Sequence, residues 1–379
     1  MWRDVLVKIG IVKETLIGEA RVAATPETVK KLRALNQEVL VEFGAGIGAA
    51  ISDEMFQNEG ATIVSRAEVL RADLILQVRA LSSHEVEQLQ PHQCLVGLLE
   101  PYNETLKNLF FKKNITAFAL EALPRNTRAQ SMDVLSSQAN IAGYKSVILA
   151  ADYYKKFMPM LMTAAGTVKA AKVIVLGAGV AGLQAIATAK RLGAMVEASD
   201  VRPAVKEQIE SLGAKFIDVP FETDEEKENA AGQGGYAKPM PKSWLDRQSQ
   251  LVAEKAVLAD IIITSALIPG REPPILISAE TVKKMKAGSV IVDMAAGLAI
   301  DGSGNCPLTK ANQIIVINGV TVIGLTNLPS LLSTDASALY SRNILEFIKL
   351  LFDDSGKINI NLEDELVKGC LLTNGGKLI

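Results

Sequence analysis

The 379-residue chain contains 49% hydrophobic residues and has a formal net charge of -2, a composition that allows a large buried core and predicts two globular domains. Because 40 basic residues nearly balance 42 acidic ones and no basic block stands out, nucleic acid and an anionic membrane surface are excluded as implied partners. No apolar run has the length of a signal peptide or of a membrane span, so the sequence predicts no direct membrane insertion.

The few histidines and cysteines limit the catalytic and metal sites that the chain can form. The two histidines, His84 and His92, lie in a polar stretch and are predicted to be surface residues, which leaves little material for a histidine-centred triad or metal cage. The three cysteines, Cys94, Cys306 and Cys370, form no CxxC pair. This dispersal indicates a reducing compartment, with the cytoplasm as the expected location, and no metal site is predicted.

The N-terminal portion of the chain alternates short apolar strands with helical segments. Strands are predicted over 7–13, 38–43, 62–64, 74–78, 95–99 and 116–121, with helices over 25–35 and 52–59. Such alternation is typical of a parallel sheet covered by helices. The glycine-rich segment 44–49 follows a strand, but no acid-terminated strand follows it at the distance a nucleotide site needs, so we interpret it as a structural turn.

The following portion of the chain repeats this pattern. Strands are predicted over 173–176, 196–199, 216–219, 261–264, 290–293, 314–317 and 320–323, with helices over 203–212 and 279–285. Two long helices, over 132–157 and 331–351, are predicted to join the two portions. The expected fold is therefore α/β, with two Rossmann-like domains that have parallel sheets and are joined by the long helices around a cleft. A discontinuous N-terminal domain takes 1–135 plus 331–379, and a Rossmann domain takes 136–330.

The most informative motif lies in the predicted Rossmann domain, where an apolar strand runs into Gly177-x-Gly179-x-x-Gly182 and then into an alanine-rich helix. Gly177 permits a tight turn, Gly179 lets the backbone approach a pyrophosphate, and Gly182 allows close packing of helix and strand. Ala178, Val180 and Ala181 complete the turn, whose N–H groups face the phosphates. The motif predicts a dinucleotide site.

Asp200 ends the next strand, close to the spacing of about 20 residues at which an acid binds the adenosine ribose. Its carboxylate would accept from the 2′-hydroxyl and repel a 2′-phosphate, which favours NAD over NADP. Arg202, two positions on, leaves two alternatives: it contacts a phosphate, or it forms a salt bridge or packs on the ribose.

The segment between Phe221 and Trp244 begins with acidic residues, continues with glycines, and then contains Tyr236 and prolines. This composition predicts a structureless loop that contributes nothing to the core. Glycines that act as a hinge beside an aromatic ring favour a functional lid, and a dispensable surface insertion is the alternative.

A second polar constellation precedes the first long helix. Arg125, Gln130, Asp133 and Ser136 concentrate donors and acceptors there, and Asp133 and Ser136 are spaced to share a helix face. A nicotinamide carboxamide needs such groups to fix the ring face from which a hydride leaves. A helix cap with a surface ion pair is the alternative interpretation.

Over essentially its whole length, the chain resembles the NAD(H)-binding domain I of proton-translocating nicotinamide nucleotide transhydrogenases, which are relatives of alanine dehydrogenase. The resemblance is carried by six stretches: 9–14, 19–26, 128–138, the glycine turn with 199–203, 234–237 and 264–270. It implies that Arg125, Gln130, Asp133 and Ser136 surround the nicotinamide and that Tyr236 lies on a loop closing over the nucleotide. It also implies that Asp200, Val201 and Arg202 hold the ribose, with Gly235, Gln248 and Leu267 near the nucleotide.

The resemblance further implies a hydride transfer from NADH on this chain to NADP⁺ on a partner domain or subunit. Membrane-spanning and NADP-binding subunits would be separate polypeptides, with this chain peripheral on the cytoplasmic face of the inner membrane. A homodimer is also implied. The loop over 293–306 is longer than the family's compact turn, and the 222–228 stretch is unusually acidic, so the geometry there stays open.

Alanine dehydrogenase is the main alternative, because it shares the fold, the cofactor and the opening motif. Oxidation of an amino acid requires a cation for the carboxylate and a general base. Alanine dehydrogenases carry a lysine and a histidine in the segments that correspond to 74–80 and 95–101, where this chain has neither, although Arg79 could still bind an anion. A nucleotide-sensing protein without turnover is a third class.

Overall fold

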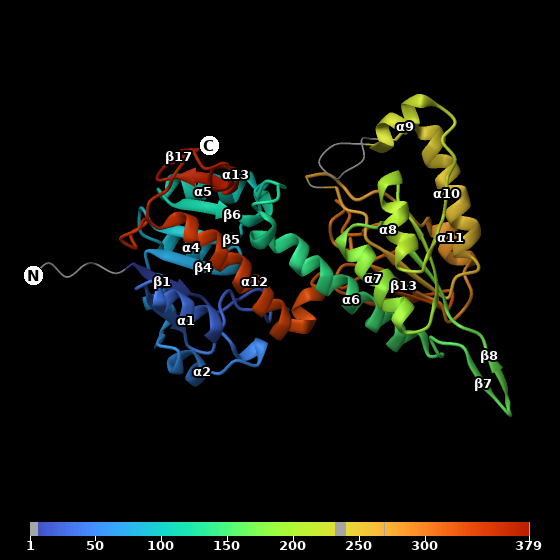
Figure 1. Ribbon diagram of the computed structural model, residues 1–379, viewed down its shortest axis with the longest axis horizontal. Helices are drawn as coiled ribbons and strands as arrows, with labels where there is room; N and C mark the ends of the chain where they lie inside the picture. The colour runs from blue at the N-terminus through green and yellow to red at the C-terminus, as the bar shows by residue number, and fades with distance from the viewer. Residues whose placement is uncertain (1–6, 232–239, 269, 379) are drawn as a thin grey trace, which may run out of the picture. The chain divides into compact units, whose positions relative to one another are not determined.

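The computed structural model describes residues 7–231, 240–268 and 270–378 (Figure 1). These residues form two compact units, one of 1–138 with 329–379 and the other of 139–328, within the described ranges. Each unit has its own sheet and its own core, so each is described by itself.

The first unit is built on an eight-stranded sheet with the order β17-β16-β6-β5-β4-β1-β2-β3. Its strands are β1 (Lys8–Ile11), β2 (Glu38–Glu42), β3 (Thr62–Val64), β4 (Leu74–Arg79), β5 (Cys94–Leu98), β6 (Thr116–Ala119), β16 (Leu371–Asn374) and β17 (Lys377–Leu378). Strands β1 to β6 pair in parallel, whereas β16 pairs antiparallel with β6 and with β17. The chain order reverses between β1 and β4, which is where open α/β sheets bind ligands.

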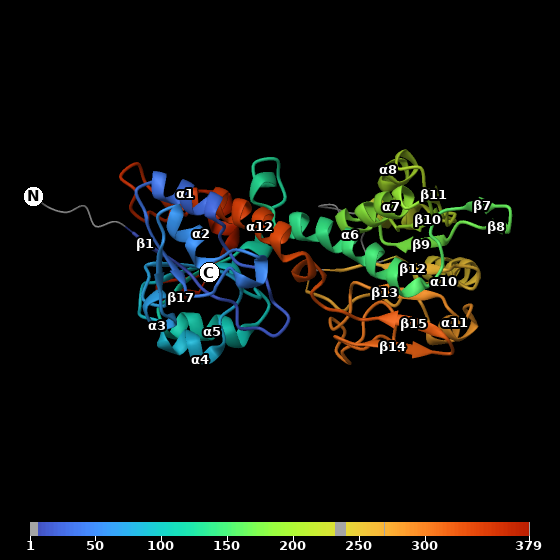
Figure 2. The ribbon, with the colours of Figure 1, turned by 90° about the horizontal axis from the view of Figure 1, so that it is seen from below.

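Helices cover both faces of this sheet. They are α1 (Pro26–Ala34), α2 (Asp53–Asn58), α3 (Arg66–Val69), α4 (Ser83–Gln88), α5 (Glu104–Lys112), α12 (Ser333–Ile348) and α13 (Glu365–Cys370). Figure 2 shows α1, α2 and α12 on one face and α4 and α5 on the other. Phe56 and Phe347 belong to the core under the first face, and Phe110 to the core under the second. Both faces of the strands are therefore buried, which explains why these strands read as nearly continuous apolar runs.

The second unit has a seven-stranded sheet with the order β11-β10-β9-β12-β13-β15-β14. Its strands are β9 (Lys172–Leu176), β10 (Met195–Ser199), β11 (Lys215–Phe216), β12 (Ile261–Thr264), β13 (Val290–Asp293), β14 (Ile314–Ile317) and β15 (Val320–Ile323). All neighbouring pairs are parallel except β14 with β15. The order reverses between β9 and β12, so a ligand is expected at the carboxyl ends of these two strands.

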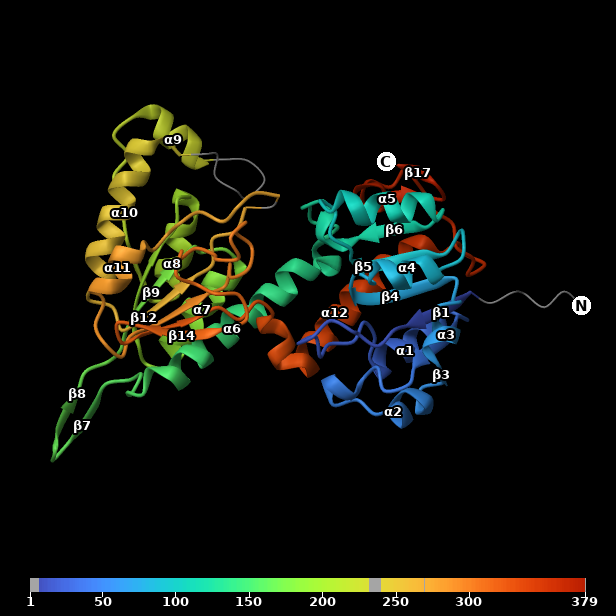
Figure 3. The same ribbon diagram turned by 180° about the vertical axis from the view of Figure 1, so that it is seen from behind.

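The helices of the second unit are α7 (Val180–Arg191), α8 (Lys206–Ser211), α9 (Asp224–Ala231), α10 (Lys242–Ala256) and α11 (Ala279–Lys284). Helices α7 and α8 pack with the C-terminal half of α6 (Val134–Tyr154) on one face, and α10 and α11 pack on the other (Figure 3). Short 3₁₀ turns complete the structure: Ile47–Ala49, Leu120–Ala122, Gln130–Met132, Pro203–Val205, Leu328–Leu332 and Lys349–Leu351. Among the described residues, no helix combines the length and the apolar character that crossing a bilayer requires.

The predicted α/β class with two Rossmann-like sheets is confirmed, and several local predictions need correction. The segment after Phe221 is not a structureless loop throughout, because α9 occupies Asp224–Ala231. Ala230, Met240 and Trp244 are buried together in a small core, so this segment does contribute to packing. The strand predicted over 216–219 is reduced to Lys215–Phe216.

A hairpin that the sequence did not predict separates α6 from β9. It consists of β7 (Leu161–Thr163) and β8 (Gly166–Val168), which within the described ranges pair only with each other (Figure 1). The two predicted long helices are α6 and α12, and both are shorter than expected. Helix α6 begins at Val134 because Asp133 caps it, and it ends at Tyr154 rather than near 157.

Candidate functional site

The surroundings of the three glycines in the turn between β9 and α7 differ. Gly177 has φ +94°, a left-handed conformation that side chains disfavour, and an added Cβ would lie 2.8 Å from Ser265 Oγ. An added Cβ on Gly182 would lie 1.9 Å from the carbonyl oxygen of Gly177, so only glycine lets α7 pack this closely on the turn. In contrast, an added Cβ on Gly179 would have nothing within 4 Å, which leaves open space in front of the helix N-terminus.

This arrangement can hold an anion. Gly179 is the N-cap of α7, and Val180 and Ala181 begin the helix, where the first N–H groups have no partner within the helix. The helix dipole adds partial positive charge at the same end. Open space above Gly179 thus lies in front of N–H groups that an anionic group could reach, which is the arrangement of a dinucleotide turn.

Asp200 and Arg202 form a compact ion pair beside the turn. The Asp200 carboxylate accepts hydrogen bonds from the backbone N–H groups of Ala178 at 2.7 Å and Arg202 at 2.9 Å. The Arg202 guanidinium donates to both oxygens, from Nε at 2.9 Å and from Nη2 at 2.8 Å. Of the two alternatives for Arg202, the structure therefore contains the salt bridge. Val201 between them is half-buried against the small core around Trp244.

The residues predicted near a nicotinamide lie in the first unit, before and at the start of α6. Ser136 donates from its backbone N–H to Asp133 at 2.9 Å and from its hydroxyl at 2.6 Å. Asp133 thus lies at the N-cap rather than on the helix, which corrects the expectation of a shared helix face. Arg125 and Gln130 have exposed side chains in the segment that leads to this cap.

The other predicted nucleotide contacts are dispersed. Gln248 on α10 is buried, and its Nε2 lies 3.5 Å from the Oγ of Ser199 at the end of β10. Leu267 follows β12 and is exposed. Gly235 and Tyr236 lie outside the described residues, so their predicted roles rest on the sequence alone.

Sequence reasoning missed Ser265. Its hydroxyl donates to the carbonyl oxygen of Gly177 at 2.9 Å and fixes the glycine turn against the end of β12. A signal was present, because a serine directly after the strand that neighbours β9 must lie at the switch point of the sheet.

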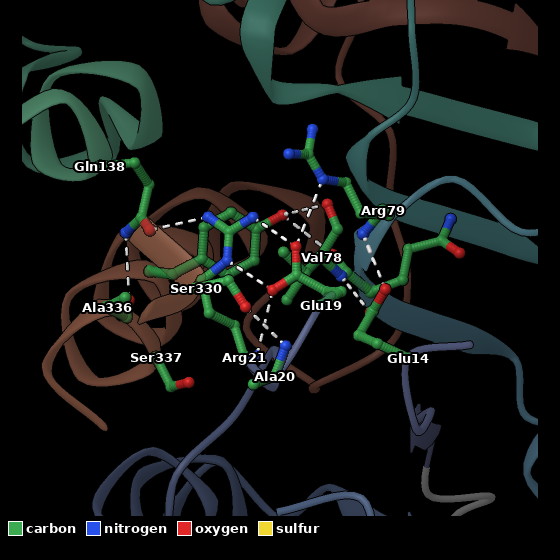
Figure 4. Close-up of polar contacts among 12 residues, drawn as sticks. Glu14, Glu19, Ala20, Arg21, Val78, Arg79, Gln138, Ser330, Ala336 and Ser337 are labelled. Carbon is green, nitrogen blue, oxygen red and sulfur yellow. Dashed lines mark hydrogen bonds and ion pairs between the residues drawn. The ribbon is translucent and has the colours of Figure 1, made fainter. Parts of the chain in front are cut away.

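The corresponding position in the first unit holds a buried polar cluster (Figure 4). Glu19 accepts from the N–H and Nε of Arg21, at 3.0 Å and 2.8 Å, and from Arg79 Nε at 3.3 Å. Arg21 also donates to Gln138 at 2.8 Å. The side chains of Glu19 and Arg21 are almost completely buried, so this guanidinium is already paired inside the protein.

Glu14 caps the end of β4 in the same cluster. Its carboxylate accepts the backbone N–H of Val78 at 2.6 Å and that of Arg79 at 3.1 Å. Burial raises the pKa of Glu14 to about 7, although these two N–H groups oppose the shift. The cluster therefore presents internal pairs, and the described residues that form it include neither a lysine nor a histidine.

Comparisons with known proteins decide the family. The chain matches the model "Alanine dehydrogenase/PNT, N-terminal domain" over 10–142 and "Alanine dehydrogenase/PNT, C-terminal domain" over 146–379. The chain belongs to the alanine dehydrogenase/PNT family. The resemblance found in the sequence is thereby confirmed.

Three relatives within this family illustrate the similarity. The NAD(P) transhydrogenase subunit alpha of Haemophilus influenzae is 44% identical, over 98% of this chain and 71% of its own length. The crystal structure of transhydrogenase from Sinorhizobium meliloti is 42% identical and superposes with a TM-score of 0.83, covering 98% of each chain. An L-alanine dehydrogenase structure is 25% identical, with a TM-score of 0.80 over 98% of this chain and 97% of that one.

Proposed function

We propose that this chain is the NAD(H)-binding subunit of a proton-translocating NAD(P) transhydrogenase of the Re/Si-specific type. The observation that carries the proposal is the glycine turn, in which the space around Gly177 and Gly182 admits only glycine and the space in front of Gly179 is open. The 44% identity to a transhydrogenase alpha subunit supports the same assignment.

Each predicted residue has a proposed role. The turn from Gly177 to Gly182 would hold the pyrophosphate, and Asp200 with Val201 and Arg202 would hold the adenosine ribose. The remaining proposed contacts are Arg125, Gln130, Asp133, Ser136 and Tyr236 at the nicotinamide, with Gly235, Gln248 and Leu267 near the nucleotide. Bound NADH supplies a hydride from C4 of its nicotinamide, and NADP⁺ on the partner accepts it, so the two-electron exchange releases no proton.

The chain's task in this reaction is to position the ring and to exclude water. Direct transfer requires the reacting carbons to approach within about 3–3.5 Å, and alignment of this quality supplies most of the acceleration. No general base is needed. The proposed contacts agree with this. They are the backbone N–H groups of the glycine turn and the helix cap that Asp133 and Ser136 form.

The buried cluster of the first unit supports transhydrogenation over amino-acid oxidation. A substrate carboxylate needs an available cation, and the oxidation needs a base. Arg21 is paired with Glu19 and Gln138, and Arg79 with Glu19. To reach Arg21, a substrate carboxylate would have to displace these buried partners at a substantial desolvation cost, whereas Arg79 is 37% exposed and leaves room for an anion.

The proposed assembly contains further subunits. Membrane-spanning and NADP-binding transhydrogenase subunits would complete the enzyme and couple the exchange to proton translocation. This chain would lie on the cytoplasmic face of the inner membrane through those subunits, as a homodimer.

A reconstitution tests the function. The purified chain is mixed with the NADP-binding polypeptide of a transhydrogenase, and the reduction of an NAD analogue by NADPH is followed. We expect rapid exchange in the mixture, none with either component alone, and no NADH formation from alanine and NAD⁺. Oxidation of alanine by the chain alone would establish the dehydrogenase instead. Binding of NADH without exchange in any mixture would identify a nucleotide-sensing protein.

A further inference from the structure

One peptide group inside the glycine turn is held from two sides. This peptide group joins Gly177 to Ala178. Its carbonyl oxygen accepts a hydrogen bond from the Ser265 hydroxyl at 2.9 Å, and its N–H donates to the Asp200 carboxylate at 2.7 Å. Because a peptide group is planar, these two bonds together fix the direction in which the whole group faces.

The two anchors come from the two strands that flank β9. Strand β10 pairs with β9 on one side and is followed directly by Asp200, whereas β12 pairs with β9 on the other side and is followed directly by Ser265 (Figure 2). The backbone N–H of Ser265 also donates to the carbonyl oxygen of Leu176 at 2.8 Å. The sheet itself therefore brings the serine to the turn.

The composition of the turn explains why it needs anchors outside itself. Gly177 has φ +94° and no side chain, so its backbone is freer to reorient than that of other residue types. A Cβ added to Gly177 would lie 2.8 Å from the Ser265 hydroxyl oxygen, and one added to Gly182 would lie 3.1 Å from it. The hydroxyl thus lies against both glycines whose surroundings are crowded.

The anchored peptide group directly precedes the N–H groups that are proposed to face the pyrophosphate. Those of Gly179 and Val180 have no acceptor within the part of the chain that the structure describes, and open space lies in front of Gly179. Rotation of the anchored peptide group would change the direction of the N–H groups that follow it. A turn that is fixed before the ligand arrives loses less entropy on binding.

We propose that Ser265 is a positioning residue for the pyrophosphate: its hydroxyl holds the turn in the conformation that binds the anion, without touching the nucleotide. The inference rests on the proposed function, because it takes the bound anion to be the pyrophosphate of NADH. Ser265 acts only through the turn. Its contribution should therefore appear with every ligand that carries the pyrophosphate and disappear with a ligand that lacks it.

The test compares Ser265→Ala, which removes the hydroxyl, with Ser265→Thr, which retains one. Ser289→Ala is the matched control, because Ser289 is buried and donates to the carbonyl oxygen of Lys286, but precedes β13 at the amino edge of the same sheet. NADH is titrated into each chain, and ADP and adenosine are titrated by displacement of NADH. ADP carries the two phosphates without the nicotinamide, and adenosine carries neither.

Ser265→Ala should weaken the binding of NADH and of ADP by a similar factor, about three- to tenfold, which corresponds to the loss of one hydrogen bond. The same variant should bind adenosine as the parent chain does. Ser265→Thr should bind all three ligands as the parent does, because it keeps the hydroxyl. Ser289→Ala should also match the parent, although it loses a comparable hydrogen bond within the same unit.

Three results would overturn the inference. The first is a Ser265→Ala chain that binds both NADH and ADP as tightly as the parent. The second is a loss confined to NADH, which would place the hydroxyl against the nicotinamide half of the ligand. The third is an equal loss for ADP and adenosine, which would make Ser265 a structural residue of the whole unit. A parent chain that binds neither NADH nor ADP would instead contradict the proposed function, so the two failures are distinguishable.

Discussion

At the scale of single residues, the proposed preference for NAD over NADP rests on Asp200. Its two oxygens accept hydrogen bonds from Ala178 and Arg202, which fix the orientation of the carboxylate that is proposed to meet the ribose. Asp200→Ala should weaken NADH binding about tenfold or more, since a hydrogen bond to a charged group contributes roughly 1.5–3 kcal/mol. The same change should narrow the difference between NADH and NADPH affinity, because Arg202 is then released to meet a 2′-phosphate.

Titration of both nucleotides by protein fluorescence measures this effect. Asp218→Ala is the matched control, because Asp218 pairs with Lys206 at 2.8 Å on the exposed surface of the same unit. Unchanged NADH affinity in Asp200→Ala would show that the ribose is held elsewhere.

Glu14 gives a pH dependence at the same scale. Burial raises its pKa from 4.5 to about 7, so the folded state binds a proton more tightly than the unfolded state does. Such a group stabilises the fold below the unfolded pKa, and this contribution is lost as the pH rises through the folded pKa, by about 3 kcal/mol in all. Glu14→Gln imitates the protonated form, so its stability relative to the parent should rise between pH 5 and pH 8.

Urea unfolding over this pH range measures the difference, together with the carboxyl NMR shift of Glu14. The groups that face Glu14 are Glu19, which raises its pKa, and Arg21, which lowers it. Glu27→Gln is the control, because the pKa of Glu27 is shifted in the opposite direction. Hydrogen bonds from Arg342 and Lys31 lower the pKa of Glu27 to about 2, so its effect should change only in acid. A Glu14→Gln difference that does not vary with pH would contradict the raised pKa.

At the scale of elements, what could be predicted followed from local chemistry. Apolar β-branched runs such as 261–264 and 290–293 predicted their strands correctly, because a buried parallel strand needs such residues on both faces. The glycine turn was predictable for a similar reason, since two steric requirements, at Gly177 and Gly182, lie within six residues.

What could not be predicted depended on distant partners. The polar run of α9 resembles a loop, and its helix is stabilised by Glu226, whose buried carboxylate accepts from Arg247 at 2.7 Å and from Ser243 at 3.3 Å. The sequence spacing of these residues gives no sign of that contact. The cap at Asp133, in contrast, was one of the two alternatives that the sequence offered, and the start of α6 at Val134 decides for it.

At the scale of the whole molecule, the two units use one strand order for different purposes. The order β3-β2-β1-β4-β5-β6 in the first unit is matched by β11-β10-β9-β12-β13-β15 in the second, so each has a switch point beside its first strand. In the second unit this point carries the glycine turn. In the first it carries Glu14 and the paired Arg21 and Arg79.

The assembly state is the remaining property at this scale, and the β7–β8 hairpin makes it testable. Met162 is 72% exposed and Leu161 37%, on strands that no other strand of the described chain covers. Apolar side chains of this kind favour self-association, so the chain should run at twice its mass of 40.6 kDa in sedimentation equilibrium. Met162→Asp should shift the chain toward monomer at least about tenfold, from the lost apolar burial. Val316→Asp, at a 67% exposed position on β14, should not. A Met162→Asp chain that stays dimeric at the same concentration would place the interface elsewhere.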